Sequence, residues 1–228
     1  MNKDNYLNNL YKNRFTKSSE KEEIQRIKMW KVLCKHFFQQ FIPKNSTVCD
    51  VAAGYCEFIN LIEAKEKIAI DLNPSVKEYA NSNVTIVNDN VFNIDRHVEK
   101  DSVDVFFMSN FLEHLNSSDE VILLVKKLSE MLRMGGVIII LQPNIRLVKG
   151  AYWDFIDHKL PLTEKSLKEV AEYCNLEVDT CITRFLPYTT KSSLPKNTFL
   201  IWLYLKLMPL SSFFLGKQSF LVLKRLSK

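Results

Sequence analysis

The hydrophobic residues of the chain follow two alternating patterns: short continuous apolar runs, and longer stretches with apolar positions at helical spacing. Continuous short runs are typical of strands that are buried on both faces of a sheet. Apolar residues that recur every three or four positions predict helices. The expected strands are residues 47–52, 67–71, 84–88, 103–109 and 136–142, and the expected helices are residues 20–40, 57–64, 74–81, 119–133 and 163–173. This alternation predicts a doubly wound α/β fold with a mostly parallel sheet.

Two further apolar runs close the chain, LEVDTCITRF at residues 176–185 and QSFLVLKRL at residues 218–226. We expect them to be strands that pair antiparallel. A length of 228 residues suits one α/β domain. We expect that domain at residues 41–228, with an N-terminal lid and helix at residues 1–40 and an apolar insertion at about residues 186–216. Gly135-Gly136 is expected to end the helix that precedes the fifth strand.

The charges of the chain are distributed unevenly. Residues 1–35 carry nine Lys and Arg against four Asp and Glu, and residues 184–228 carry eight Lys and Arg and no acid. The residues between them hold 14 basic and 22 acidic side chains, so two basic ends flank an acidic body. A basic tail without acids indicates an anionic partner such as a phosphate, a lipid headgroup or a nucleic acid. The alternative is that these basic side chains are ordinary solvent-exposed surface residues without a specific partner.

The cysteine content and the N-terminus bear on location. The five cysteines are an odd number, and no two of them have C-x-x-C spacing. This argues against a disulfide framework or a structural zinc site, and for a reducing compartment. The first 15 residues contain no continuous apolar core, which argues against a signal peptide. We therefore expect a cytoplasmic protein.

Ligands of doubly wound sheets bind at the carboxyl ends of the strands. The first expected strand ends in Asp50 and leads into the small residues Ala52, Ala53 and Gly54. Small residues at such a turn let backbone amides approach a ligand. Only one glycine of a three-glycine turn is present, since Ala52 and Cys56 hold the other two positions; alanine is tolerable there if its φ is negative.

The next strands also end in polar residues. Asp71 ends the second strand, 17 positions after Gly54, where a carboxylate can accept hydrogen bonds from the two hydroxyls of a ribose. Asn88-Asp89-Asn90 follows the third strand, and SNFLEHL (residues 109–115) follows the fourth. Together these tips predict a nucleotide-type cofactor site, although each could be an ordinary turn.

The motifs VCDVAAGYCEF, IAIDLNP, VNDNVF, VDVFFMSNFLEHL and LRMGGVIIILQPN, in this order over residues 46–144, resemble those of class I S-adenosylmethionine-dependent methyltransferases. The resemblance implies a Rossmann-like, seven-stranded, mostly parallel sheet flanked by helices, with its last strand antiparallel. It also implies S-adenosyl-L-methionine as the cofactor. The C-terminal half more loosely resembles bacterial methyltransferases of surface-glycan or lipid pathways.

The resemblance implies roles for single residues around the cofactor. Those for the methionine part are Asp50, Ala52 and Gly54 in the first loop and Asn110 and Phe111 after the fourth strand. Those for the nucleoside are Asp71 at the ribose, Leu72 on the adenine, and Asp89, Asn90 and Val91 around the adenine edge. Arg14, in an N-terminal segment with Tyr6, Tyr11 and Phe15, is a candidate to reach the cofactor's carboxylate from a lid. The alternative for that segment is a frayed terminus.

An oxygen acceptor must lose a proton, so a general base is needed. His114, beside Glu113, and His158, after the fifth strand, are the candidates among four histidines. Both could instead be structural. No metal-ligand cluster stands out in the sequence, although Asp154, Asp157 and His158 lie close together.

The acceptor is not specified by the sequence. We expect an oxygen of a small molecule, a sugar or a lipid-linked glycan, and no nucleic acid. Two other functions stay open: a nicotinamide-dependent oxidoreductase, and a non-catalytic interaction protein with a decayed cofactor loop.

TFLIWLYLKLMPLSSFFLG (residues 198–216) is the most apolar stretch of the chain. Lys206, Pro209 and a Ser-Ser pair interrupt it, which argues against a transmembrane helix. It could form core over the sheet edge. It could also be an interfacial patch that, with its surrounding cations, contacts the inner face of an anionic membrane.

Overall fold

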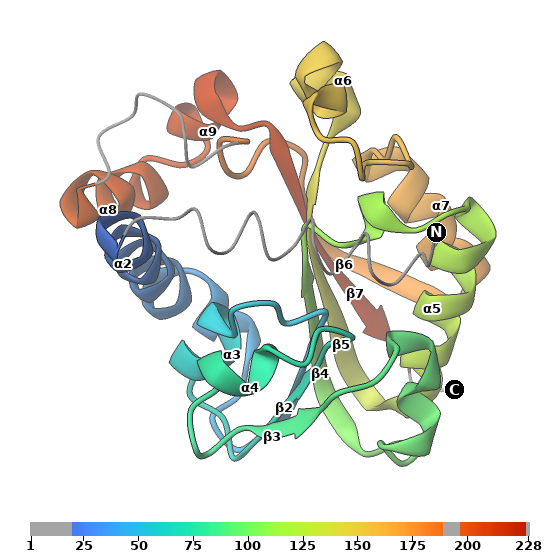
Figure 1. Ribbon diagram of the computed structural model, residues 1–228. Coiled ribbons are helices and arrows are strands. Elements are labelled where there is room, and N and C mark those ends of the chain that lie inside the picture. Colours follow the sequence, from blue (N-terminus) through green and yellow to red (C-terminus); the bar gives the residue numbers. More distant parts are fainter. Residues whose placement is uncertain (1–19, 189–196, 227–228) are drawn as a thin grey trace.

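A computed structural model describes residues 20–188 and 197–226, which form one seven-stranded sheet with helices on both faces (Figure 1). The strand order is β3-β2-β1-β4-β5-β7-β6. The strands are β1 (Thr47–Val51), β2 (Glu66–Ile70), β3 (Thr85–Val87), β4 (Val103–Ser109), β5 (Leu132–Pro143), β6 (Leu176–Ile182) and β7 (Gln218–Arg225). The chain order reverses between β1 and β4, so the carboxyl ends of these two strands border the switch point where α/β sheets bind ligands.

The strands β1 to β5 pair in parallel, whereas β7 pairs antiparallel with both β5 and β6. The last strand in the chain therefore lies inside the sheet and β6 lies at its edge. The predicted α/β class, the mostly parallel sheet and the antiparallel final pair are confirmed.

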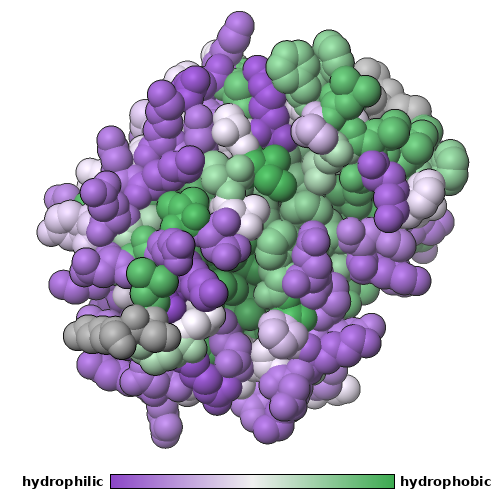
Figure 2. Space-filling view, turned by 180° about the vertical axis from the view of Figure 1, so that it is seen from behind, coloured by the Kyte–Doolittle hydropathy of each residue, from purple (hydrophilic) through white to green (hydrophobic). Residues whose placement is uncertain are grey.

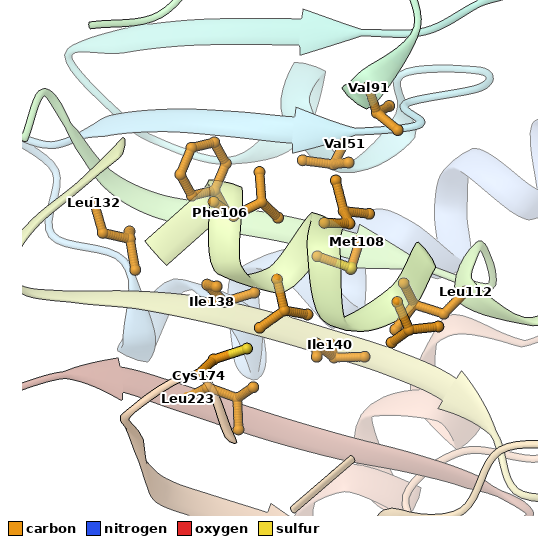
Figure 3. Close-up of a cluster of buried hydrophobic side chains, with 14 of the residues drawn as sticks. Val51, Val91, Phe106, Met108, Leu112, Leu132, Ile138, Ile140, Cys174 and Leu223 are labelled. Carbon is orange, nitrogen blue, oxygen red and sulfur yellow. The ribbon is translucent and has the colours of Figure 1, made fainter. Parts of the chain in front are cut away.

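Both faces of the sheet are buried, because successive side chains of a strand point to opposite faces and those of the central strands are apolar on both. In β5, Ile138 and Ile140 belong to the core on one face, and Ile139 and Leu141 belong to the core on the other. Figure 3 shows the first of these cores, in which Ile138 and Ile140 lie with side chains of neighbouring strands. The continuous apolar runs of the sequence are thus explained by burial on two sides.

Helices cover both faces of the sheet. On one face lie α2 (Glu20–His36), the 3₁₀ turn η1 (Phe38–Phe41), α3 (Glu57–Leu61), α4 (Val76–Tyr79) and α8 (Thr198–Lys206). On the other lie η2 (Val91–Arg96), α5 (Ser118–Met131) and α7 (Glu164–Tyr173). The remaining short elements are η3 (Leu112–His114), α6 (Ile145–Val148), η4 (Lys149–Asp154) and α9 (Leu210–Leu215).

Local chemistry fixes several helix starts. The Ser117 hydroxyl accepts a hydrogen bond from the Glu120 N–H at the start of α5 (3.2 Å). At α7, Thr163 and Ser166 form a reciprocal capping box. The Asn197 side chain caps α8 by accepting from the Phe199 N–H (2.8 Å).

The predicted end of the helix at residues 119–133, which is α5, is wrong. The helix ends at Met131, and Gly135-Gly136 lies within β5. Leu132 is already extended and pairs with Val103 of β4. A side chain at Gly136 would lie 2.9 Å from the Asp104 carbonyl, so this glycine permits close strand approach and does not cap a helix.

The apolar stretch at residues 198–216 forms α8, a turn and α9. Its inner side is core, since Leu205 and Ser212 are buried and Ile201 and Tyr204 pack against the cluster beneath. Its outer side is exposed and strongly apolar; in Figure 2 hydrophobic side chains gather on the side of the molecule where these helices lie. Among the described residues, no helix combines the length and the hydrophobicity that crossing a bilayer requires.

Candidate active site

A cavity of about 750 Å³ opens at the carboxyl ends of β1, β2 and β4. Most of the residues that the sequence predicted for the cofactor line it. They are Asp50, Ala52, Gly54, Asp71, Leu72, Asn90, Val91, Asn110 and Phe111. His114 lines it as well, together with Asp157 and Lys159 from the segment after β5. The cavity therefore joins the predicted cofactor residues to one of the predicted catalytic histidines.

The loop after β1 turns through three left-handed residues. Ala52, Gly54 and Cys56 have φ values of 58°, 52° and 58°. The negative φ that would make alanine readily tolerable at position 52 is therefore not present. The loop keeps the backbone path that glycines favour, and at two positions a side chain occupies a strained conformation. Cys56 is fully buried at the start of α3, where its Sγ lies 3.9 Å from the Val76 carbonyl oxygen.

Asp71 holds this loop from the neighbouring strand. Its Oδ2 accepts a hydrogen bond from the Gly54 N–H (2.8 Å), and its Oδ1 accepts one from the Asn73 N–H (2.8 Å). Burial raises the pKa of Asp71, and these two backbone hydrogen bonds act in the opposite direction. The carboxylate retains free lone pairs for further donors, because each oxygen can accept more than one hydrogen bond.

Three carboxylates line one wall of the cavity: Asp50, Glu57 and Asp71. Burial, followed by the nearby Asp71 and Glu57 carboxylates, raises the pKa of Asp50 well above its ordinary value of 3.8. Burial also raises the pKa of Glu57, while an ion pair with Arg26 of α2 lowers it. The Arg26 guanidinium lies 3.9 Å from the centre of the Tyr55 ring, so α2 is fastened to the loop by a charge and a cation–π contact. This wall favours a positively charged ligand group.

The residues at the tips of β2 and β3 form another part of the cavity lining. Leu72 is 60% exposed at the tip of β2 and lines the cavity. Asn90, Val91 and Phe92 line the cavity as well. Asp89, which the sequence placed beside the adenine, is not among the lining residues; its carboxylate binds the His97 ring (2.7 Å) and the Asn93 amide (2.8 Å). These contacts lower the pKa of Asp89 to about 2.

The tip of β4 delivers Asn110 and Phe111 to the middle of the cavity. Asn110 has a φ of 49°, and its backbone N–H donates to the Leu141 carbonyl of β5 (2.8 Å). Phe111 is partly buried and packs on the core beneath. A left-handed asparagine at a strand tip is tolerated better than other residues and turns the chain sharply out of the sheet.

Past this turn, a polar cluster gathers four side chains: Glu113, His114, Asp157 and His158. Glu113 is 1% exposed, and its Oε1 lies 3.9 Å from the Nε2 atoms of both His114 and His158. The His114 Nδ1 lies 3.1 Å from the Asp157 backbone carbonyl oxygen and 3.3 Å from its carboxylate. Burial raises the pKa of Glu113, and the neighbouring His114 counteracts this. The two predicted catalytic histidines are thus brought together, although they lie 44 positions apart in the sequence.

The ligand atoms of Glu113, His114 and His158 lie within 4.8 Å of one another, so these residues could hold a metal ion. This grouping differs from the Asp154, Asp157 and His158 set that the sequence brought close together. Asp154 is exposed on η4. Sequence reasoning missed Glu113 as a partner of His158, and it missed Trp30, which α2 contributes to the cavity lining. Arg14 and the rest of the predicted lid lie outside the described residues.

Comparison with known proteins identifies the type of reaction. Residues 49–140 match the family model described as a methyltransferase domain. The protein is a methyltransferase. On this seven-stranded fold the arrangement is that of class I, and the cofactor is S-adenosyl-L-methionine. The match covers β1 to β5 with the cavity loops and leaves the C-terminal elements unassigned.

Solved structures share the fold of the methyltransferase at low sequence identity. An S-adenosylmethionine-dependent methyltransferase from Archaeoglobus fulgidus is 18% identical over 86% of this chain and 92% of its own, with a TM-score of 0.64. One from Mesorhizobium loti is 12% identical over 82% of this chain and 94% of its own, with a TM-score of 0.59. A Haloferax volcanii complex of a methyltransferase with the Trm112 activator matches at 12% identity over 87% and 90%, with a TM-score of 0.64. The search of curated proteins found no match.

The family match decides between the functions that the sequence left open. A methyltransferase domain explains the cavity loops, whereas a nicotinamide-dependent oxidoreductase and a non-catalytic scaffold lack any such support. The nature of the methyl acceptor does not follow from these comparisons.

Proposed function

We propose that the methyltransferase transfers the methyl group of S-adenosyl-L-methionine to a hydroxyl oxygen of a sugar or lipid-linked acceptor. The observation that carries this proposal is the composition of the single 750 Å³ cavity: cofactor-type residues at one end and the His114 cluster at the other. When bound, the cofactor supplies a methyl group on a positively charged sulfur, whose bond to carbon breaks with its electron pair left on sulfur as the bond to the acceptor oxygen forms.

In this proposal the tips of β2 and β3 bind the nucleoside. Asp71 accepts hydrogen bonds from the ribose hydroxyls with its remaining lone pairs. Leu72 and Val91 cover the two sides of the adenine, and Asn90 presents polar groups at its edge. The exposure of Leu72 supports this role because a bound base would bury it. Since the Asp89 carboxylate is already engaged by His97 and Asn93, we assign it to fixing the Asn90 turn.

The loop after β1 and the tip of β4 bind the methionine part. Ala52 and Gly54 place backbone close to it, and Asn110 and Phe111 close the opposite side. Asp50 and Glu57 supply negative charge near the positively charged groups of the cofactor. We include Arg14 of the N-terminal segment as a partner for the cofactor's carboxylate, on the sequence resemblance alone.

The acceptor binds at the far end, where His114 lines the cavity and His158 supports it from behind through Glu113. Because methyl transfer depends mainly on alignment of donor and acceptor, these residues act by holding the acceptor oxygen in line. As the new C–O bond forms, the acceptor hydroxyl gives up its proton to water in the open cavity.

Calorimetry with S-adenosyl-L-methionine and Asp71→Asn tests the cofactor assignment. The asparagine keeps the shape of the side chain but loses the charge and one acceptor oxygen. Loss of charge-assisted hydrogen bonds costs about 1.5–3 kcal/mol each, so affinity should fall by about tenfold or more. Asp179→Asn, the same substitution at an exposed aspartate of the edge strand β6, is the control and should change affinity little. Equal affinities of Asp71→Asn and wild type would refute the ribose role.

We further propose that the outer side of α8 and α9 delivers the enzyme to an anionic membrane that carries the acceptor. This apolar docking surface consists of Phe199, Leu207, Leu210, Phe213 and Phe214. Leu210, Phe213 and Phe214 are 65%, 64% and 71% exposed. A cluster of this size on a monomer indicates a contact partner.

The charges around the apolar docking surface favour a lipid partner. Lys206 and Lys217 are exposed beside it, and Arg184 lies 5.8 Å from the Phe213 ring. No acidic residue occurs between positions 184 and 228. Exposed aromatic side chains with flanking cations suit the headgroup boundary of an anionic bilayer. Such contact is peripheral and reversible.

Sedimentation with vesicles that contain anionic lipid tests this contact. Leu210→Ser should weaken binding by about tenfold, since burial of a leucine contributes about 1.5–3 kcal/mol. Leu123→Ser, at a half-exposed leucine of α5 on the opposite face, is the matched control. Binding should also fall with added salt. Protein that stays in the supernatant at low salt would show that the surface binds no lipid.

A further inference from the structure

Three ligand-type side chains, Glu113, His114 and His158, converge at the acceptor end of the cavity. Glu113 is almost fully buried, and within residues 20–188 and 197–226 its ion-pair partners are the His114 and His158 imidazoles alone. Asp157, also buried, places a second carboxylate on the other side of His114. A buried carboxylate such as that of Glu113 is costly unless a positive charge compensates it. A bound cation would supply that charge.

We propose that Glu113, His114 and His158 bind a divalent first-row metal ion such as Mn²⁺, Co²⁺ or Zn²⁺. Two imidazoles and one carboxylate form a donor set that these ions prefer, whereas Mg²⁺ and Ca²⁺ prefer oxygen donors. The proposal rests on the proposed function because it makes the ion the contact for the acceptor hydroxyl.

The distances fit an ion with small closing movements. Glu113 Oε1 lies 3.9 Å from each of the two Nε2 atoms, and all three ligand atoms lie within 4.8 Å. Donors at right angles around an ion with bonds of about 2.1 Å stand about 3 Å apart. Rotation of the two imidazole rings can close this difference.

The surroundings orient His114 and Glu113 as a metal site requires. A metal-binding histidine usually donates its other ring N–H to a carbonyl or carboxylate. The His114 Nδ1 faces the Asp157 carbonyl oxygen at 3.1 Å, which leaves Nε2 toward Glu113. The second oxygen of Glu113 accepts a hydrogen bond from the buried Gln142 amide (2.8 Å), which leaves Oε1 toward the histidines.

The backbone also ties the two halves of the cluster together. The Glu113 carbonyl accepts hydrogen bonds from the Lys159 N–H (2.8 Å) and the Leu160 N–H (3.1 Å). These bonds place the segment that carries His158 against η3. The three ligands therefore come from two segments that are fixed to each other before any ion binds.

The ion would have open positions on the cavity side, because three protein ligands leave at least one position vacant. His114 is the ligand that lines the cavity, so those positions face the acceptor. An ion that binds the acceptor hydroxyl lowers its pKa, and the proton passes to water in the open cavity. In this arrangement His114 and His158 hold the ion and do not take the proton themselves.

The test is titration of chelator-treated protein with Co²⁺, whose absorption bands report its ligands. The wild type should show saturable Co²⁺ absorption that excess Mg²⁺ does not remove. His158→Gln and His114→Gln should each weaken Co²⁺ binding by about 100-fold or more. Loss of a residue that only hydrogen-bonds a metal ligand already weakens metal binding by about 10–100-fold, and these two residues are ligands themselves. His36→Gln, the same substitution at an exposed histidine of α2, should leave it unchanged.

Calorimetry with S-adenosyl-L-methionine on the same samples separates the two proposals. Unchanged cofactor affinity in His158→Gln would show that the variant is folded and that its loss concerns the ion. Absence of a Co²⁺ band in a wild type that binds the cofactor would overturn the metal site and leave the proposed function intact. Co²⁺ binding without cofactor binding would support the metal site and count against the proposed function.

Discussion

The left-handed conformation of Ala52 leads to a prediction with a built-in control. Ala52 and Ala53 are adjacent, both are partly buried, and only Ala52 has a positive φ. Substitution of each by glycine gives the unfolded chain the same added freedom, which costs about 0.4–1 kcal/mol. At Ala52 glycine also relieves a strain of about 1–2 kcal/mol that a side chain incurs in the left-handed region.

We therefore expect Ala52→Gly to be neutral or to stabilise the protein by up to about 1 kcal/mol. Ala53→Gly should destabilise it by about 1 kcal/mol, because its methyl group also packs against the core. The two variants should differ by about 1–2 kcal/mol. With a urea dependence of about 2 kcal/mol per molar, their unfolding midpoints should lie roughly 0.5–1 M apart.

Urea unfolding followed by circular dichroism measures this difference directly. Equal destabilisation by both substitutions would refute the left-handed turn at Ala52. Calorimetry with S-adenosyl-L-methionine should find the affinity of Ala52→Gly unchanged, since the backbone path stays the same. A large loss of affinity would mean that the methyl group of Ala52 itself contacts the cofactor.

Three further substitutions probe the charged wall of the cavity. Asp71→Ala should lower the free energy of unfolding by about 3 kcal/mol even without cofactor, because two backbone N–H groups lose a charged acceptor; unchanged urea stability would contradict this. Arg26→Gln should cost about 2 kcal/mol, measured by urea unfolding, since Glu57 would be left partly buried without its ion pair; an unaltered midpoint would show that the pair is solvated. Asp50 has a folded-state pKa raised above 3.8, so its ionisation favours unfolding, and wild-type stability should fall as pH rises from about 4 through that pKa. Asp50→Asn removes this loss, so its stability relative to wild type should increase with pH in thermal unfolding scans; a constant difference across pH would argue against the raised pKa.

Much of the fold could be predicted because strand patterns are local. The apolar runs of β1, β4 and β5 are continuous, and their carboxyl ends meet at one edge once the strands are parallel. The same reasoning put Gly54 and Asp71 at one edge of the sheet, and the Gly54 N–H donates to the Asp71 carboxylate (2.8 Å). The pairing of the strands determines which residues at their carboxyl ends lie next to one another.

Other features depend on long-range contacts or on backbone dihedral angles, and neither can be predicted from a local sequence pattern. Nothing in the residue type of Ala52 indicates a φ of 58°, because alanine ordinarily avoids that region. The approach of His158 to Glu113 depends on how the chain returns after β5, held by hydrogen bonds from Lys159 and Leu160. The apolar stretch at residues 198–216 could be read as core or as surface, and the structure has one side of each kind.

The central position of β7 has a consequence for how the protein is made. As the ribosome releases the chain, β1 to β5 can assemble in order, but β6 pairs with no earlier strand and must wait for β7. Between the two strands, the apolar helices α8 and α9 are already synthesised while the β5 edge is still unpaired. Until β7 inserts, that open edge and these helices are exposed together and invite aggregation. A pause in translation before β7 would therefore leave an aggregation-prone, partly folded chain. Early contact of α8 and α9 with a chaperone or a lipid surface would cover their apolar side chains and reduce aggregation.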